Sequence, residues 1–148
     1  DYVWIKGNLL TRNQIMKITG TKMDEETSSL AVCLETILAY EGYSRDAQEL
    51  IDKGYSAIEI MEEAMPEAEV LELQGCTLDS VLYYVNRDIP VLFIGDDGEA
   101  VLIVGFNELN TVWMNPENGR VYKVGMNDSK EYFEKRGNNF IAYLKQND

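Results

Sequence analysis

Few side chains in this 148-residue chain could do covalent chemistry, and histidine is missing altogether. Without an imidazole, the chain cannot build a Ser-His-Asp or Cys-His catalytic centre from its own residues. Histidine-ligated zinc and a histidine pH switch are excluded for the same reason. The strongest potential nucleophiles are the thiols of Cys33 and Cys76. Catalysis by either thiol would need a base other than histidine, and the sequence places none beside them.

Both cysteines are better explained as structural residues. Cys33 lies in an apolar helical pattern with Leu34 and Ile37, so we expect its thiol to point into the core, where burial raises a thiol pKa. Cys76 follows Gly75, just before another expected helix. Two cysteines make no disulfide framework, and no CxxC spacing is present. A bridge between Cys33 and Cys76 stays open, because spacing along the chain does not give their separation in space.

Acidic and amide side chains in the expected turns offer oxygen atoms that could hold Ca²⁺ loosely. They are Asp96, Asp97, Glu99, Asn107, Glu108, Asn115, Glu117 and Asn118. Their spacing lacks the EF-hand pattern D-x-[DN]-x-[DN]-G, and polar turns have this composition for conformational reasons of their own. We therefore predict no metal site and no cofactor.

The charge of the chain is strongly negative and unevenly placed. Its 26 acidic and 13 basic residues give a net charge of −13. Residues 24–72 contain 14 of the acids and only two bases, so nearly all of the excess lies there. This charge argues against nucleic-acid binding and against docking on anionic membranes, since both need clustered Lys and Arg. No apolar run is long enough for a membrane-spanning helix, so we predict no membrane insertion.

The elements that would position these residues fall into two groups. Hydrophobic periodicity predicts helices over residues 30–40, 44–54, 57–65 and 78–85, and a short helix over 129–135. Candidate N-cap residues precede the first four: Thr27, Ser28 or Ser29; then Ser44; then Ser56, with Glu59 completing a capping box; then Thr77. Strands are expected over 70–73, 91–94, 99–106, 111–114, 120–124 and 140–144. Helices first and a strand meander afterwards predict an α+β domain over 1–148, with 1–22 an N-terminal extension of unassigned placement.

Four local sequences, in this order, resemble the bacteriocin-processing cysteine peptidases, a papain-like family. The segment 29–42 resembles the nucleophile helix C-G-x-x-C-L…I-L-x-Y-x-G, and 88–92 resembles the strand entry G-x-P-V-I. The segment 99–106 resembles the histidine-bearing strand H-x-V-V-I-V-G-Y, and 115–119 resembles the turn D-P-x-x-G. The resemblance covers about residues 23–144. It implies a papain-like fold with an N-terminal helical lobe, an antiparallel β-sheet lobe and a groove between them.

The same resemblance implies that the catalytic residues of the family are lost. Ser29 stands at the position of the nucleophilic cysteine, Glu99 at that of the general-base histidine, and Asn115 at that of the orienting Asp or Asn. Counting back six residues places Met23 at the position of the oxyanion-hole glutamine. Only Asn115 keeps a permitted residue type. A carboxylate is a weaker base than an imidazole, and a lost oxyanion donor typically costs ~3 kcal/mol of transition-state stabilisation.

Each substituted position also has an ordinary structural explanation. Ser29 is better explained as a helix cap, since serine is a favoured N-cap residue. Glu99 is equally expected to be a surface carboxylate beside Asp96 and Asp97, although the family position faces the groove. Trp113, in an expected strand, is included with Ser29 and its partners as a candidate ligand contact.

The leading hypothesis is therefore a catalytically inactive peptidase-like domain. It would bind a basic or neutral peptide or protein partner in the groove, opposite the acidic helical lobe. A hydrolase of the same clan with a Ser29, Glu99 and Asn115 centre is the first alternative. A structural or adhesive module of a larger bacterial surface protein is the second, with other domains of that chain as partners. The resemblance favours an extracellular or cell-surface location in a bacterium, with a cytoplasmic one left open.

Overall fold

The helices precede most of the strands along the chain, as the sequence pattern indicates, with one additional strand near the N-terminus. The computed structural model describes residues 3–4 and 27–146. The helices are α2 (Ser29–Tyr40), α3 (Ala47–Asp52), α4 (Ala57–Ala64), α5 (Leu78–Val85) and α6 (Met126–Lys135). The strands are β1 (Val3–Trp4), β2 (Ala68–Gln74), β3 (Val91–Ile94), β4 (Ala100–Phe106), β5 (Asn110–Met114), β6 (Val121–Gly125) and β7 (Asn139–Lys145). Every element expected from the sequence is present.

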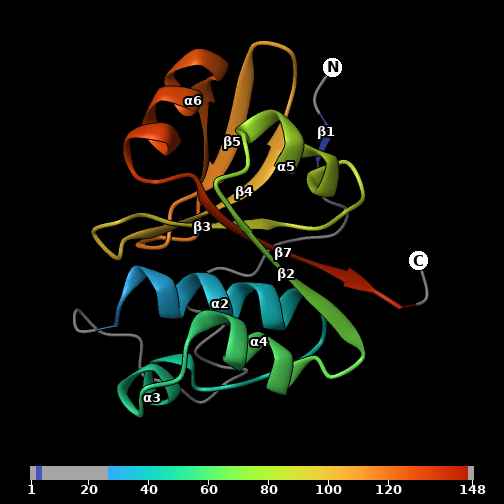
Figure 1. The fold of residues 1–148 in the computed structure, drawn as a ribbon, viewed down its shortest axis with the longest axis vertical. Helices are drawn as coiled ribbons and strands as arrows, with labels where there is room; N and C mark the ends of the chain where they lie inside the picture. Colours follow the sequence, from blue (N-terminus) through green and yellow to red (C-terminus); the bar gives the residue numbers. More distant parts are fainter. Residues whose placement is uncertain (1–2, 5–26, 147–148) are drawn as a thin grey trace.

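One antiparallel sheet divides the molecule into two layers of helices (Figure 1). The strand order is β2-β7-β3-β4-β5-β6, and β1, from the segment left unassigned, pairs with the end of β4. Helices α2, α3 and α4 lie on one side of the sheet, and α5 and α6 lie on the other (Figure 1). The α+β prediction is confirmed. The sheet nevertheless extends beyond the expected meander, because β2, which precedes the meander in the chain, pairs with β7 at one end.

Helix starts follow local side-chain chemistry, and two of them differ from the prediction. Ser56 and Glu59 form the predicted capping box of α4. Ser28, not Ser29, caps α2, because the Ser28 hydroxyl accepts the N–H of Ala31 at 3.1 Å. Asp46, not Ser44, caps α3, and the buried Glu35 carboxylate accepts the N–H of Ala47 at 2.9 Å. Ser29 is thus the first residue of α2, with its hydroxyl free for another role.

An aromatic cluster fills the core between the sheet and α6. Phe133 of α6 is fully buried, and its ring centroid lies 4.5 Å from that of Phe93, 4.9 Å from Trp113 and 5.2 Å from Phe140. The Trp113 indole N–H donates to the Thr111 hydroxyl at 2.7 Å. One helix residue therefore joins β3, β5 and β7.

Polar contacts also join the sheet to α2. The buried hydroxyl of Tyr143, on β7, donates to the carboxylate of Glu41 at the end of α2, and Lys145 Nζ lies 3.5 Å from the same carboxylate. Burial raises the pKa of the Tyr143 phenol, and the Glu41 charge raises it further. The phenol therefore stays protonated and keeps its role as donor. In the part of the chain that the structure describes, no helix is long and apolar enough to cross a membrane.

Candidate functional site

A cavity of about 890 Å³ lies at the N-terminal end of α2, where that helix meets the sheet and α6. The start of β4, the β5–β6 turn and the C-terminal half of α6 complete its walls. Its lining residues are Thr27, Ser28, Ser29, Val32, Asp97, Glu99, Ala100, Val101, Asn115, Pro116, Glu117, Tyr122, Tyr132 and Arg136. Ser29, Glu99 and Asn115, which are far apart in the sequence, therefore share one open cavity.

Ser29 and Glu99 form a direct hydrogen bond in this cavity. The Ser29 hydroxyl donates to Glu99 Oε2 at 3.0 Å, and the Ser29 hydroxyl oxygen accepts the backbone N–H of Ala100 at 2.9 Å. The two contacts use the hydroxyl once as a donor and once as an acceptor. Ser29, the first residue of α2, thus links this helix to Ala100, the first residue of β4.

The turn before β4 fixes the position of Glu99. Gly98 has a φ of +85°, a conformation that suits glycine, and the Asp97 carboxylate accepts the N–H of Glu99 at 3.0 Å. Glu99 is exposed and reaches Ser29 across the mouth of the cavity. Glu99 therefore lines the cavity, as an exposed carboxylate at the start of β4.

Asn115 uses its side chain to hold a turn. Its Oδ1 atom accepts the N–H of Glu117 at 2.9 Å, and its own N–H donates to the carbonyl of Arg120 at 2.8 Å. Within the described residues, no hydrogen bond joins the Asn115 side chain to Ser29 or Glu99. The three positions are therefore brought together in space, but only the first two contact each other.

The cavity combines acidic groups with one cation held on an aromatic ring. Asp97, Glu99 and Glu117 contribute carboxylates, while the Arg136 guanidinium lies 3.7 Å from the Tyr132 ring centroid. Arg136 also donates to the backbone carbonyl of Tyr132 at 3.2 Å, which fixes its place. Tyr132 of α6 and Arg136, which directly follows α6, were absent from the predicted site. Their i, i+4 spacing on a helix was the available signal, but it did not indicate which groove the helix would line.

Other predicted contributors lie elsewhere. Trp113 is 4% exposed and belongs to the aromatic core, so the structure does not bring it into the cavity lining. Cys33 is fully buried, and burial raises its thiol pKa, as the helical pattern predicted. Cys33 and Cys76 are both free thiols. Met23 lies outside the described residues.

Several of the carboxylates and amides weighed as calcium ligands hold turns of the backbone. In residues 3–4 and 27–146, no group of three or more His, Cys, Asp or Glu side chains is arranged to hold a metal ion. Asp97, Asn107, Asn115 and Asn118 each accept a backbone N–H of their own turn. Turn formation therefore accounts for these residue types.

Comparison with solved structures gives two informative likenesses. A protein described as a C39-like peptidase from Bacillus anthracis superposes with a TM-score of 0.69 and 14% sequence identity, over 82% of this chain and 90% of that one. A double glycine motif protease from an AMS/PCAT transporter, in complex with the leader peptide, superposes with a TM-score of 0.58 and 14% identity, over 99% of each chain. No family model and no curated protein matches the sequence. The resemblance stated from local sequence is thus confirmed at the level of architecture: this chain has the papain-like fold of the C39-type peptidases.

Proposed function

We propose that this domain binds an extended peptide, or an extended loop of a protein partner, in the cavity at the start of α2 and does not cleave it. The hydrogen bond between Ser29 and Glu99 carries this proposal. At the two positions where the fold supports a nucleophile and its base, the chain has a hydroxyl and a carboxylate bonded to each other. The chain has no histidine that could replace Glu99.

The environment of the Ser29 hydroxyl also disfavours catalysis. Transfer of the hydroxyl proton along this hydrogen bond would give an alkoxide and a neutral Glu99 acid, and it is strongly unfavourable because a carboxylate is a far weaker base than an alkoxide. The Ser29 oxygen accepts the N–H of Ala100, so this donor is already used in the ground state. The pair therefore forms a polar contact between helix and sheet, and the second oxygen of the Glu99 carboxylate is left for a ligand.

The shape and polarity of the cavity suit a peptide. It is open to solvent, and it offers Val101, Tyr122 and Tyr132 for apolar contact beside carboxylates for polar contact. One structural neighbour is a protease solved with a leader peptide bound. The excess of carboxylates over Arg136 favours a basic or neutral ligand.

Filling the cavity with a long side chain should abolish peptide binding. We expect pools of basic or neutral decapeptides to bind the unmodified domain at low salt and to bind Val101→Arg at least tenfold more weakly, because Val101 lines the cavity. Isothermal titration calorimetry measures both affinities. Val121→Arg is the matched control, since Val121 is 46% exposed on β6 and does not line the cavity. Equal affinities for all three proteins would contradict the proposal, as would the absence of any binding.

The hydrolase alternative is favoured by one observation, the 3.0 Å separation of Ser29 Oγ and Glu99 Oε2, which is within reach for proton transfer. The two functions predict opposite results with a fluorophosphonate probe for activated serines. For the non-cleaving domain, we expect no labelling, with or without Ser29→Ala. Labelling that disappears in Ser29→Ala would establish the hydrolase and remove the proposal above.

A further inference from the structure

We propose that Arg136 determines the specificity of the cavity at Ser29 by binding a carboxylate group of the peptide, either at the peptide's C-terminus or on one of its side chains. This inference rests on the proposed function and adds the class of peptide that the cavity accepts. Arg136 is the C-cap residue of α6, and it lines the cavity together with Ser29 and Glu99. A peptide in the cavity therefore meets a guanidinium as well as carboxylates.

An aromatic ring holds this guanidinium in place. Its carbon atom lies 3.7 Å from the centroid of the Tyr132 ring, and its Nη1 atom donates to the Tyr132 carbonyl at 3.2 Å. The Tyr132 ring is itself fixed by the aromatic core, because its centroid lies 4.9 Å from that of Trp113 and 5.5 Å from that of Phe133. A stacked guanidinium has lost much of its freedom before a ligand arrives, so binding a carboxylate costs less conformational entropy.

Most of the hydrogen-bond donors of Arg136 are unused. A guanidinium carries five N–H donors, and the contact with the Tyr132 carbonyl uses one of them. In the described part of the chain, the Arg136 side chain makes no other hydrogen bond and no ion pair. Two parallel N–H groups of a guanidinium match the two oxygens of a carboxylate, and such charge-assisted pairs are stronger than neutral hydrogen bonds. A carboxylate is therefore a suitable ligand for this side chain.

The acidic residues of the cavity do not neutralise Arg136, but they limit the charge of its ligand. Asp97 accepts the N–H of Glu99, and Glu99 accepts the hydroxyl of Ser29, while neither carboxylate forms an ion pair with Arg136. A phosphate group also fits a guanidinium, but its charge of about −2 would be repelled more strongly by these acids than the single charge of a carboxylate. The favoured ligand is a peptide with one carboxylate and otherwise neutral or basic groups.

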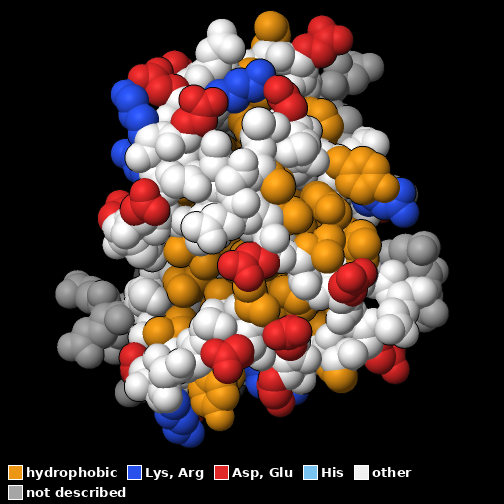
Figure 2. Space-filling view, in the orientation of Figure 1, with side chains coloured by type: hydrophobic (Ala, Val, Ile, Leu, Met, Phe, Trp, Pro, Cys, Tyr) orange, Lys and Arg blue, Asp and Glu red, His pale blue; other side chains and the backbone are white. Residues whose placement is uncertain are grey.

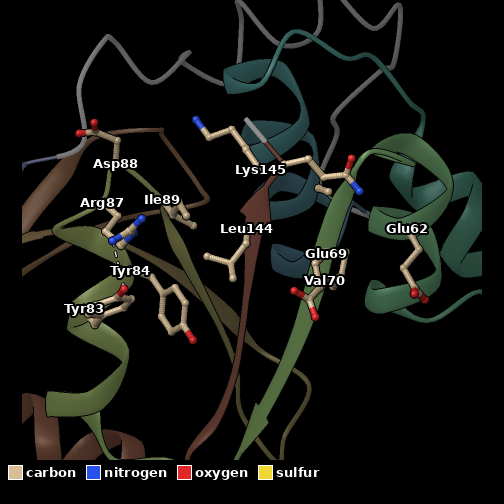
Figure 3. A pocket seen from close by; sticks show the side chains of 12 residues that line it. Glu62, Glu69, Val70, Tyr83, Tyr84, Arg87, Asp88, Ile89, Leu144 and Lys145 are labelled. Carbon is tan, nitrogen blue, oxygen red and sulfur yellow. Dashed lines mark hydrogen bonds between the residues drawn. The ribbon is translucent and has the colours of Figure 1, made fainter. Parts of the chain in front are cut away.

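The position of Arg136 at the end of α6 explains its charge but not its stacking, since any cation is favoured near a helix C-terminus. A similar pair, Tyr83 and Arg87, occurs at the end of α5, and Figure 3 shows it beside a separate groove of about 1100 Å³. There the guanidinium carbon lies 5.3 Å from the ring centroid, and Nη1 donates to the Tyr83 hydroxyl at 3.1 Å. Arg87 is therefore a matched control with the same residue pair in another groove.

Three peptide pools test the inference on the unmodified chain. All are N-acetylated decapeptides of glycine, alanine, leucine, tyrosine and lysine. The first pool ends in a free carboxylate, the second in an amide, and the third ends in an amide and contains one internal glutamate. Figure 2 shows acidic side chains spread over the face drawn there, and the chain has a net charge of −13, so non-specific attraction favours the more positive second pool. We expect a pool with a carboxylate to bind at least tenfold more tightly than the second pool.

Isothermal titration calorimetry at low salt measures the three affinities. A tenfold gain in the first pool assigns Arg136 to the C-terminal carboxylate of the peptide, and a gain in the third pool alone assigns it to a side-chain carboxylate. Either result supports the inference. Equal affinities of all three pools would overturn the inference and leave the proposed function intact. No binding of any pool would overturn both.

Variants of the two arginines locate the contact. Arg136→Gln should reduce the difference between the carboxylate pool that binds and the amide pool to less than threefold. Arg87→Gln removes the same charge in the other groove and should leave that difference at tenfold or more. In the unmodified chain, the NMR signal of the Arg136 Nε–H group should shift with the carboxylate pool and not with the amide pool. An unchanged signal, or an equal loss of preference in both variants, would overturn the inference.

Discussion

A cysteine placed at position 29 is expected to react with iodoacetamide about 100 times faster at pH 6 in Ser29→Cys/Glu99→His than in Ser29→Cys alone. In the single variant the thiol lies beside the Glu99 carboxylate, which disfavours a second negative charge and raises the thiol pKa. In the double variant an imidazolium and the start of α2 both favour the thiolate, and such surroundings lower a cysteine pKa from ~8.5 to ~6.5 or below. A lower pKa means more thiolate at pH 6, so alkylation accelerates.

The rate is read by mass spectrometry of the peptide that contains residue 29. Cys33 gives no background because it is buried and its thiol pKa is raised, and Cys76→Ser removes the other thiol. Ser29→Cys/Glu99→Gln separates the two causes, since it removes the negative charge without adding a positive one, and its rate should be intermediate. Equal rates for all three variants would show that positions 29 and 99 do not correspond to a nucleophile and its base.

The second large effect concerns stability. Phe133→Ala is expected to lower the free energy of unfolding by about 3–5 kcal/mol. Phe133 is fully buried and packs against aromatic rings from three strands, so alanine would leave a cavity that rigid neighbours cannot close. Urea denaturation followed by tryptophan fluorescence measures the change, since Trp113 lies in the same cluster. Val121→Ala, at an exposed site, should stay within about 0.5 kcal/mol of the unmodified protein.

Local features of this fold were predictable wherever the deciding interaction lies within a few residues. The Ser56 and Glu59 capping box, the burial of Cys33 and the five strands after Pro90 all depend on near neighbours or on simple alternation. The start of α3 was not predictable in this way. Asp46 competes with Ser44 for the cap, and the buried Glu35, 12 residues earlier, accepts the N–H of Ala47.

The candidate site also has some residues that local sequence predicts and others that depend on contacts between distant segments. The local resemblance pointed to Ser29 and Glu99 as neighbours, and the structure has them hydrogen-bonded. Arg136 and Tyr132 were not predicted as site residues, because helical spacing predicts a helix but not the cavity that the helix lines. Trp113 was chosen for its residue type, yet strand alternation and the packing of α6 place it in the core. Contacts between segments far apart in the chain decided each of these cases.

The position of β7 has a consequence for synthesis of the protein. This strand lies in the interior of the sheet, between β2 and β3, although it follows every other described element in the chain. During translation, β2 has no strand partner and β3 has only β4 until residues 139–145 leave the ribosome. While the last third of the chain is made, the nascent chain therefore has two unpaired strand edges, and the aromatic cluster around Phe93 lacks Phe140. Such edges and exposed apolar side chains favour aggregation until β7 pairs with β2 and β3.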